Sequence, residues 1–169
     1  ADRFVGADQR VRYLAYDVAR LTPDIFASHA GTQHATAILA LNTFLHLTAE
    51  QRTQCWSFID EILAPGGKVY VEDFFQKEPL RPGVYDLMVK ESGCAYLPDQ
   101  SQHSELIAEV LPSARIEVED ISKIYANYAK QRHESYGGDD PGKRRFYKTV
   151  SDCLNGGGVG GIRIRVEKP

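Results

Sequence analysis

The sequence lacks several features that would assign it at once to a functional class. Among its 169 residues, no apolar stretch approaches the ~20 residues that a membrane-spanning helix needs. No long run of like charges interrupts the balance of 20 Lys and Arg against 23 Asp and Glu, and the net charge is −3. We also see no signal-peptide pattern at its start. We therefore expect one domain, residues 1–169, that binds neither nucleic acid nor a membrane.

Cysteine is scarce and scattered. Cys55, Cys94 and Cys153 lie far apart, with no C-x-x-C pair. An odd, dispersed set argues against a disulfide framework and is typical of a reducing compartment. We therefore expect a cytoplasmic protein.

A glycine-rich nucleotide loop is absent from the place where it would work. The segment 155–161, NGGGVGG, has five glycines in six positions, but it follows an expected helix and precedes an expected strand. A phosphate-binding loop has the reverse order, because amides at the start of a helix must meet the phosphates. We interpret Asn155 and Gly156 as a helix C-cap and the remaining glycines as a flexible lead into an edge strand.

What the sequence does contain is a strand–helix–strand unit. The run 35–45, ATAILALNTFL, is nearly continuous in apolar residues, as a buried parallel strand is, although periodicity alone also allows a buried helix. The next helix begins with a capping box of Thr48 and Gln51 and ends at Pro65-Gly66-Gly67. A strand over 68–75 follows directly. Units of this kind build parallel sheets.

Further segments extend the pattern to the whole chain. We predict helices at 83–92, 101–112 and 141–155, and strands at 11–18, 114–124 and around 162–166. The fold class is therefore α/β, a Rossmann-like and mostly parallel sheet with helices on both faces.

Polar side chains end three of the predicted strands. They are Asp17, Asn42 and Asp73. In open α/β sheets, ligands bind beyond the carboxyl ends of the strands, where a carboxylate accepts hydrogen bonds from a ribose hydroxyl or an adenine amine. The preference of Asp and Asn for turns accounts equally well for any one of them. The three together predict a site.

These segments resemble the second half of a class I S-adenosylmethionine-dependent methyltransferase. The matching stretches are the strand end Asp17-Val18, the segment Leu41 to Leu47, and the helix–PGG–strand block ending in Leu63 to Asp73. The segments ARIEVEDI and GGIRIRVEKP suit the C-terminal antiparallel strand pair of that family. The resemblance covers nearly the whole chain. It implies transfer of a methyl group from S-adenosylmethionine to a small-molecule acceptor.

The resemblance also implies roles for particular residues. Asp17 and Val18 would meet the adenine ring, with Asp17 accepting from its exocyclic amine. Leu41 and Asn42 would lie on the methionine or adenine side of the pocket. His46 would stand near the transferring methyl as a general base, since histidine titrates near neutral pH. A histidine in an ordinary loop before a capped helix explains His46 equally well.

A substrate pocket is predicted from aromatic and polar residues near the strand ends. The segment 121–138 is rich in tyrosine, and in the resembling family the region between the last two strands often caps the acceptor site. Phenol and imidazole rings suit such a pocket because each has an apolar body and a polar tip. An amphipathic surface helix is the alternative. The predicted substrate-binding residues are Asp73, Tyr85, Tyr125, Tyr128 and His133.

Histidines also raise the possibility of a metal site. His29, His34 and His46 lie close in sequence, with Asp17 or Asp24 as a carboxylate. Their spacing follows no tight ligand pattern, so we predict no metal.

The family's glycine-rich loop and the acidic end of its second strand should precede residue 10. Nothing in ADRFVGADQ fits that loop. We therefore expect that two N-terminal βα units, at least ~60 residues, are missing from this sheet. Unpaired strand edges recruit other strands, so we also expect association, as a homodimer that covers the exposed edge.

Two alternatives to a methyltransferase remain open. One is a non-catalytic α/β scaffold or partner subunit that has lost the cofactor loop. The other is a different Rossmann-like enzyme whose first half is missing. The residues encoded upstream of Ala1 separate the methyltransferase from the non-catalytic module, because an E/D-x-G-x-G loop after an apolar strand supports the methyltransferase and its absence excludes it.

Overall fold

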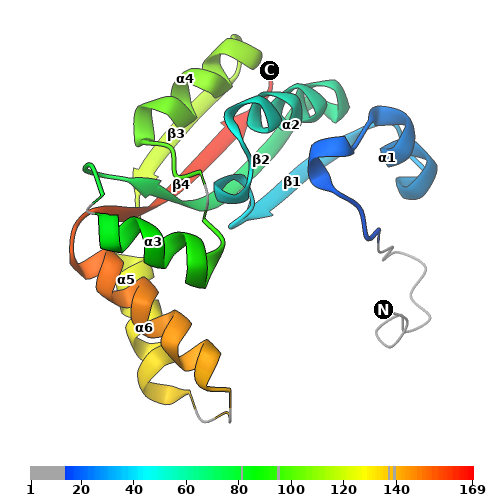
Figure 1. Ribbon diagram of the computed structural model, residues 1–169. Coiled ribbons are helices and arrows are strands. Elements are labelled where there is room, and N and C mark those ends of the chain that lie inside the picture. Colours follow the sequence, from blue (N-terminus) through cyan, green and yellow to red (C-terminus); the bar gives the residue numbers. More distant parts are fainter. Residues whose placement is uncertain (1–13, 81, 95, 137, 139) are drawn as a thin grey trace.

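The computed structural model describes residues 14–169, apart from residues 81, 95, 137 and 139. Within them, four strands form one sheet in the order β1-β2-β4-β3, with helices on both of its faces (Figure 1). The predicted α/β class is confirmed. The strands are β1 (Ala35–Leu41), β2 (Leu63–Gln76), β3 (Arg115–Asp120) and β4 (Val159–Glu167). The α-helices are α1 (Pro23–Ala30), α2 (Ala49–Ile62), α3 (Pro82–Ser92), α4 (Gln100–Val110), α5 (Ser122–Ser135) and α6 (Pro141–Asn155), and the 3-10 helices are η1 (Val18–Arg20) and η2 (Phe44–His46).

The sheet is mixed. β1 and β2 run parallel, whereas β4 is antiparallel to both β2 and β3. The predicted C-terminal antiparallel pair is confirmed. Within the described residues, one of the three strand pairings, β1–β2, is parallel. The prediction that the last strand lies at an edge was wrong. β4 lies between β2 and β3 because its Ile162, Ile164 and Val166 are buried and its backbone is paired on both sides.

Helix α2 follows its local sequence signals. The hydroxyl of Thr48 accepts from the amide of Gln51, and the side chain of Gln51 accepts from the amide of Thr48. The helix ends at Ile62, ahead of the PGG turn. Gly66 has a φ of +72°, a conformation that favours glycine, and its amide donates to the carbonyl of Lys168. This turn directs the chain back into the sheet.

The two faces of the sheet pack against different helices. On one face, Val69 and Val71 of β2 and the isoleucines of β4 join a core with α2 and α4. On the other face, Phe74 packs with Met88 of α3, Ala129 of α5 and Leu154 of α6. The alternation of side chains along a strand produces this division. The three cysteines, all within the described residues, are buried in these cores and form no disulfide.

The prediction of a strand over 11–18 was wrong for its described part. Residues 14–17 have no regular structure, and Val18–Arg20 form the 3-10 helix η1. The Asp17 carboxylate accepts from the amide of Ala19 at 3.0 Å. Such a local bond gives the backbone an alternative to strand pairing. Residues 11–13 lie outside the described residues.

The glycine run ends a helix, as the order of elements predicts, and its last two glycines also permit close packing. α6 ends at Asn155, Gly156 is its C-cap, and Gly157 has a φ of +81°. A Cβ at Gly160 would lie 2.3 Å from the ring of Phe75, and one at Gly161 would lie 2.9 Å from the ring of Tyr125. The run is therefore a turn that leads into a tightly packed strand.

Candidate functional site

The candidate site lies where β1 ends and with it the parallel pairing of β1 and β2. Leu41 is opposite Glu72 in the sheet, so the next residues, Asn42 and Asp73, lie at the same level. The amide of Asn42 donates to the carbonyl of Glu72 at 2.8 Å. Asn42 has a φ of +50°, which a residue other than glycine seldom adopts. This conformation turns the chain out of β1 and into η2.

Asp73 holds η2 against the end of β2. Its side chain is fully buried. One carboxylate oxygen accepts from the amides of Phe44, at 2.7 Å, and Leu45, at 3.2 Å, while the other accepts from the amide of Phe74 at 2.8 Å. Phe44 is in turn stacked on Trp56 of α2, with ring centroids 5.2 Å apart. Asp73 thus has a structural function, and its predicted contact with substrate stays a prediction.

Burial shifts the pKa values of Asp73, which holds η2, and of the nearby half-buried Arg52. Burial raises the pKa of Asp73 to about 6, although its three backbone hydrogen bonds and the nearby His46 act in the opposite direction. Burial lowers the pKa of Arg52, and the negative charge of Asp73 opposes that shift. Arg52 donates to the carbonyls of Leu47 and Tyr96, at 2.9 and 3.2 Å, and so ties the segment after η2 to the segment after α3.

His46 ends η2 with an exposed side chain whose orientation is set by one hydrogen bond. Its Nδ1 lies 2.9 Å from the carbonyl oxygen of Gly93, just beyond α3. A carbonyl can only accept, so Nδ1 must carry the proton in this contact. The neutral ring then has its lone pair on Nε2. This tautomer is the one that a general base at Nε2 requires.

An apolar groove of about 320 Å³ runs beside β1, between that strand, η1, α1 and α2. Val18 lines the groove together with Phe44, so the structure brings one predicted cofactor residue to the strand end. Leu41 and Asn42 follow directly after Ala40, another lining residue, and both are exposed. Its remaining lining residues are mostly aliphatic or aromatic.

Asp17 lies next to Val18 and is also exposed. Its carboxylate accepts from the amide of Ala19 and lies 3.5 Å from the guanidinium of Arg20. The side chain is therefore oriented locally, at the start of η1, while η1 packs against α2.

A polar cluster on the sheet was not anticipated from the sequence. Glu72 accepts from Nε and Nη2 of Arg163, at 2.9 and 2.7 Å, and from the hydroxyls of Tyr70 and Tyr125. Burial alone would raise the pKa of Glu72, but these bonds and the Arg163 charge bring it below its usual value. The sequence contained a signal for this cluster, since Tyr70 and Glu72 alternate with the apolar Val69 and Val71 of β2 and so lie together on the opposite face of the strand.

The five predicted substrate residues do not converge on one pocket. Tyr125 lies near the strand end, with its ring edge-on to Phe74 at 5.2 Å. Tyr128 is 56% exposed, and Tyr85 on α3 is 45% exposed. His133 is two turns of α5 beyond Tyr125, about 12 Å along the axis, and its Nδ1 lies 3.3 Å from the carbonyl of Arg144. The roles of these side chains stay predictions.

Two further observations concern histidine and metal ligands. His103 of α4 is buried, and burial, followed by the charge of Arg52, lowers its pKa to about 4. Its Nε2 has no hydrogen-bond partner within the described part of the chain. In the same residues, no group of three or more His, Cys, Asp and Glu side chains is placed to hold a metal ion.

The raised pKa of Asp73 predicts a defined pH dependence of stability. A folded-state pKa above the unfolded value gives stability that is present below about pH 3.8 and is lost as the pH rises through about 6. Asp73→Asn removes this term and also places an NH₂ group where an acceptor is needed. Measured by urea unfolding, the stability advantage of wild type over the variant should shrink by about 2 kcal/mol from about pH 4.5 to about pH 7.5.

Comparing wild type with the variant at each pH cancels the contribution of His103. That residue's lowered pKa gives the opposite slope between about pH 4 and about pH 6.5. An advantage that stays constant or grows with pH would show that Asp73 is not buried in this way.

Comparisons with known proteins bear on the fold. No protein-family model matches the sequence, and no curated protein matches it. Solved structures do match. Phosphoethanolamine N-methyltransferase 2 of Haemonchus contortus, in complex with S-adenosyl-L-methionine, is 15% identical with a TM-score of 0.63, and the match covers 79% of this chain and 33% of that one.

Two other solved structures are similar to a comparable degree. Geranyl diphosphate C-methyltransferase of Streptomyces coelicolor is 11% identical with a TM-score of 0.63, and the match covers 80% of this chain and 48% of that one. A cyclopropane synthase of Mycobacterium tuberculosis is 13% identical with a TM-score of 0.64, covering 80% and 56%. The chain thus spans about a third to just over half of these proteins. At such low identity the likeness shows the fold alone, and that fold is the one shared by class I S-adenosylmethionine-dependent methyltransferases.

Proposed function

We propose that this chain provides part of the active site of a class I methyltransferase, which transfers a methyl group from S-adenosylmethionine to a small-molecule acceptor. The observation that carries the proposal is the arrangement at the ends of β1 and β2. There an apolar groove lined by Val18 ends close to η2, whose last residue is the oriented His46. The similarity in fold to methyltransferases that act on small molecules supports the same assignment.

The residues beside the groove suit the adenosyl part of the cofactor. The groove is apolar, as the faces of an adenine ring require, and Val18 lines it. The exposed carboxylate of Asp17 has the acceptor capacity to bind an exocyclic amine. Leu41 and Asn42, at the end of β1, would lie toward the methionine part. When bound, the cofactor supplies a methyl group already activated by its sulfonium.

His46 would accept the proton that the acceptor loses. The bond from Nδ1 to the carbonyl of Gly93 fixes the ring and leaves Nε2 as the base. Alignment of the acceptor with the methyl group contributes most to the rate, because effective concentrations in oriented pairs are high. Proton removal adds about 10²- to 10⁴-fold where the acceptor must be deprotonated.

Acceptor binding is assigned to the helices around this end of the sheet. Tyr85 projects from α3, the helix that leads to the Gly93 contact of His46. The hydroxyl of Tyr125 is held by Glu72 at the end of β2. Asp73 supports η2 beneath them. Tyr128 and His133, farther along α5, would contact only a larger acceptor.

Binding of S-adenosylmethionine should depend on the Asp17 carboxylate. Asp17→Asn keeps an oxygen for the Ala19 amide but replaces an acceptor with a donor. We expect at least about tenfold weaker binding by calorimetry, since a lost hydrogen bond to a charged group costs about 1.5 to 3 kcal/mol. Asp24→Asn, on the exposed first turn of α1, removes the same charge and should bind as wild type.

The titration should include this chain and the form extended by the residues encoded upstream of Ala1. Binding by neither form would end the methyltransferase proposal and favour the non-catalytic α/β module.

The role of His46 predicts a separation of rate from binding. His46→Asn retains a donor near the Nδ1 position for the Gly93 carbonyl but has no group at Nε2. With a hydroxyl or protonated amine acceptor, kcat should fall at least about 10²-fold, with little change in the Kd of S-adenosylmethionine. His34→Asn, in the exposed loop before β1, is the matched control. A wild-type kcat in His46→Asn would refute the assignment.

We also propose that the chain forms a homodimer through the free side of β1. Within the described residues β1 is paired on one side only, by β2. Its Leu39 and Leu41 are 65% and 51% exposed, which is unusual for neighbouring large apolar side chains. A two-fold axis beside β1 would pair two copies of this strand and bury these leucines.

Light scattering tests this interface. We expect a dimer for wild type and a monomer for Leu39→Lys, because one buried lysine from each copy would face the other across the axis; Leu41, proposed to lie near the cofactor, is left unchanged. Leu87→Lys, at another exposed leucine on α3, should remain dimeric. A monomeric wild type, or loss of the dimer in Leu87→Lys as well, would contradict the proposed interface.

A further inference from the structure

The α5–α6 hairpin concentrates positive charge. Residues 122–155 contain seven Lys and Arg against four Asp and Glu, although the whole chain has a net charge of −3. The hairpin extends away from the sheet at one end of the molecule (Figure 1). This projecting element therefore carries a net positive charge while the rest of the chain is net negative, and it is distinct from the strand ends that form the proposed methyl-transfer site.

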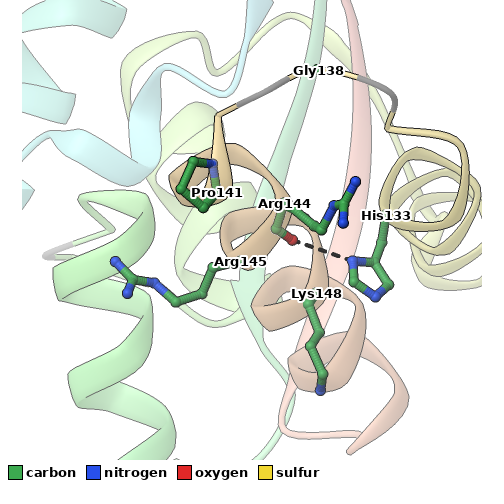
Figure 2. Close-up of a pocket in the computed structure, with 6 residues that line it drawn as sticks. All are labelled: His133, Gly138, Pro141, Arg144, Arg145 and Lys148. Atoms are coloured by element: carbon green, nitrogen blue, oxygen red, sulfur yellow. Dashed lines mark hydrogen bonds between the residues drawn. The ribbon is translucent and has the colours of Figure 1, made fainter.

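A pocket of about 520 Å³ opens on this hairpin. Figure 2 shows that its side chains come from the end of α5 and from the first turns of α6. No Asp or Glu is among the described residues that line it. The lining residues are His133, Gly138, Pro141, Arg144, Arg145 and Lys148.

Hydrogen bonds hold the centre of the pocket in place. The guanidinium of Arg144 donates from Nη2 to the carbonyl of Tyr136 at 2.9 Å, and the carbonyl of Arg144 accepts from Nδ1 of His133 at 3.3 Å. These bonds join α5, α6 and the connection between them. The ring of His133 lies beside Arg144, and its Nε2 points away from the Arg144 carbonyl that Nδ1 contacts (Figure 2). Both side chains are thus oriented before any ligand binds.

Lys148 adds a second cation on the same side of α6. It lies one turn after Arg144, and residues four apart on a helix are neighbours. Its amino group is 2.6 Å from a carboxylate oxygen of Asp152, a contact between two largely exposed side chains. Such surface pairs contribute little free energy, so this one can be exchanged for a stronger anion.

Recognition in this pocket has to come from side chains. The start of α6 is capped by Asp140, whose carboxylate accepts from the amides of Gly142 and Lys143. Those amides are therefore not available to an anion. The side chains of the lining that can donate to one belong to Arg144, Arg145, Lys148 and His133.

We propose that this pocket binds the phosphate group of a small phosphorylated molecule. Arginine offers paired donors that match phosphate oxygens, lysine adds a point charge, and His133 adds a donor from Nε2 once it is protonated. The cavity is much larger than a phosphate group, since one water occupies about 30 Å³. The surplus volume accommodates an organic body, and Pro141 and Gly138 add uncharged residues to the lining.

Titration with inorganic pyrophosphate and with glycerol 3-phosphate tests the proposal. Binding is followed through the imidazole resonances of His133 and by calorimetry. Saturable binding is expected, and Arg144→Gln should weaken it at least about tenfold through loss of a charge-assisted donor. His133→Asn retains a donor near Nδ1 for the Arg144 carbonyl and loses Nε2, so it should also weaken binding without disturbing the hairpin.

Lys130→Gln is the matched control. It removes one positive charge from an exposed position of α5 that does not line the pocket, and it should change the affinity less than about twofold. The proposal is overturned if neither phosphate binds saturably, if Lys130→Gln weakens binding as much as Arg144→Gln, or if only anionic lipid vesicles bind. None of these outcomes depends on methyl transfer, so the two proposals fail separately.

Discussion

The proposed site depends on the hydrogen bonds that the buried carboxylate of Asp73 accepts from backbone amides. The carboxylate accepts three backbone hydrogen bonds, two of them from η2, and so attaches the segment after β1 to the end of β2. Parallel strands alone would bring Asn42 and Asp73 to one level, but they would not set the course of the chain beyond them. Because η2 is held at this place, His46 reaches the carbonyl of Gly93 and is oriented by it.

Neighbouring side chains explain why the contact between Asp73 and η2 is stable although the carboxylate is removed from water. The phenyl ring of Phe44 stacks on Trp56, which secures η2 to α2 from the other side. Arg52 joins Leu47, directly after η2, to the segment that follows α3. One residue before Asp73, Glu72 faces the opposite side of the sheet and is neutralised there by Arg163. Adjacent carboxylates of β2 thus serve two layers of the molecule without sharing partners.

Features set by residues close together in the sequence could be predicted, whereas contacts between distant residues could not. α2 and α6 were predicted closely because a capping box, a C-cap glycine and an apolar face are local signals. The strand expected over 11–18 is not formed in its described part, residues 14–18, where a local bond of Asp17 competes with strand pairing. For the site, the sequence predicted that Asn42 and Asp73 lie together. It did not reveal Arg52, Gly93 or Arg163 as neighbours of Asp73, His46 and Glu72, since the members of these three pairs lie 21 to 91 residues apart.

By itself, the sequence determined the α/β class, the order of most helices and strands, and the role of the glycine run as a turn. These properties follow from side-chain periodicity and from backbone preferences that act within a few residues. Only the tertiary structure decided that β4 lies inside the sheet, that Asp73 binds backbone amides, and that the predicted substrate residues are dispersed over β2, α3 and α5. Each of these depends on which distant segments pack together, and burial decides that for the whole chain at once.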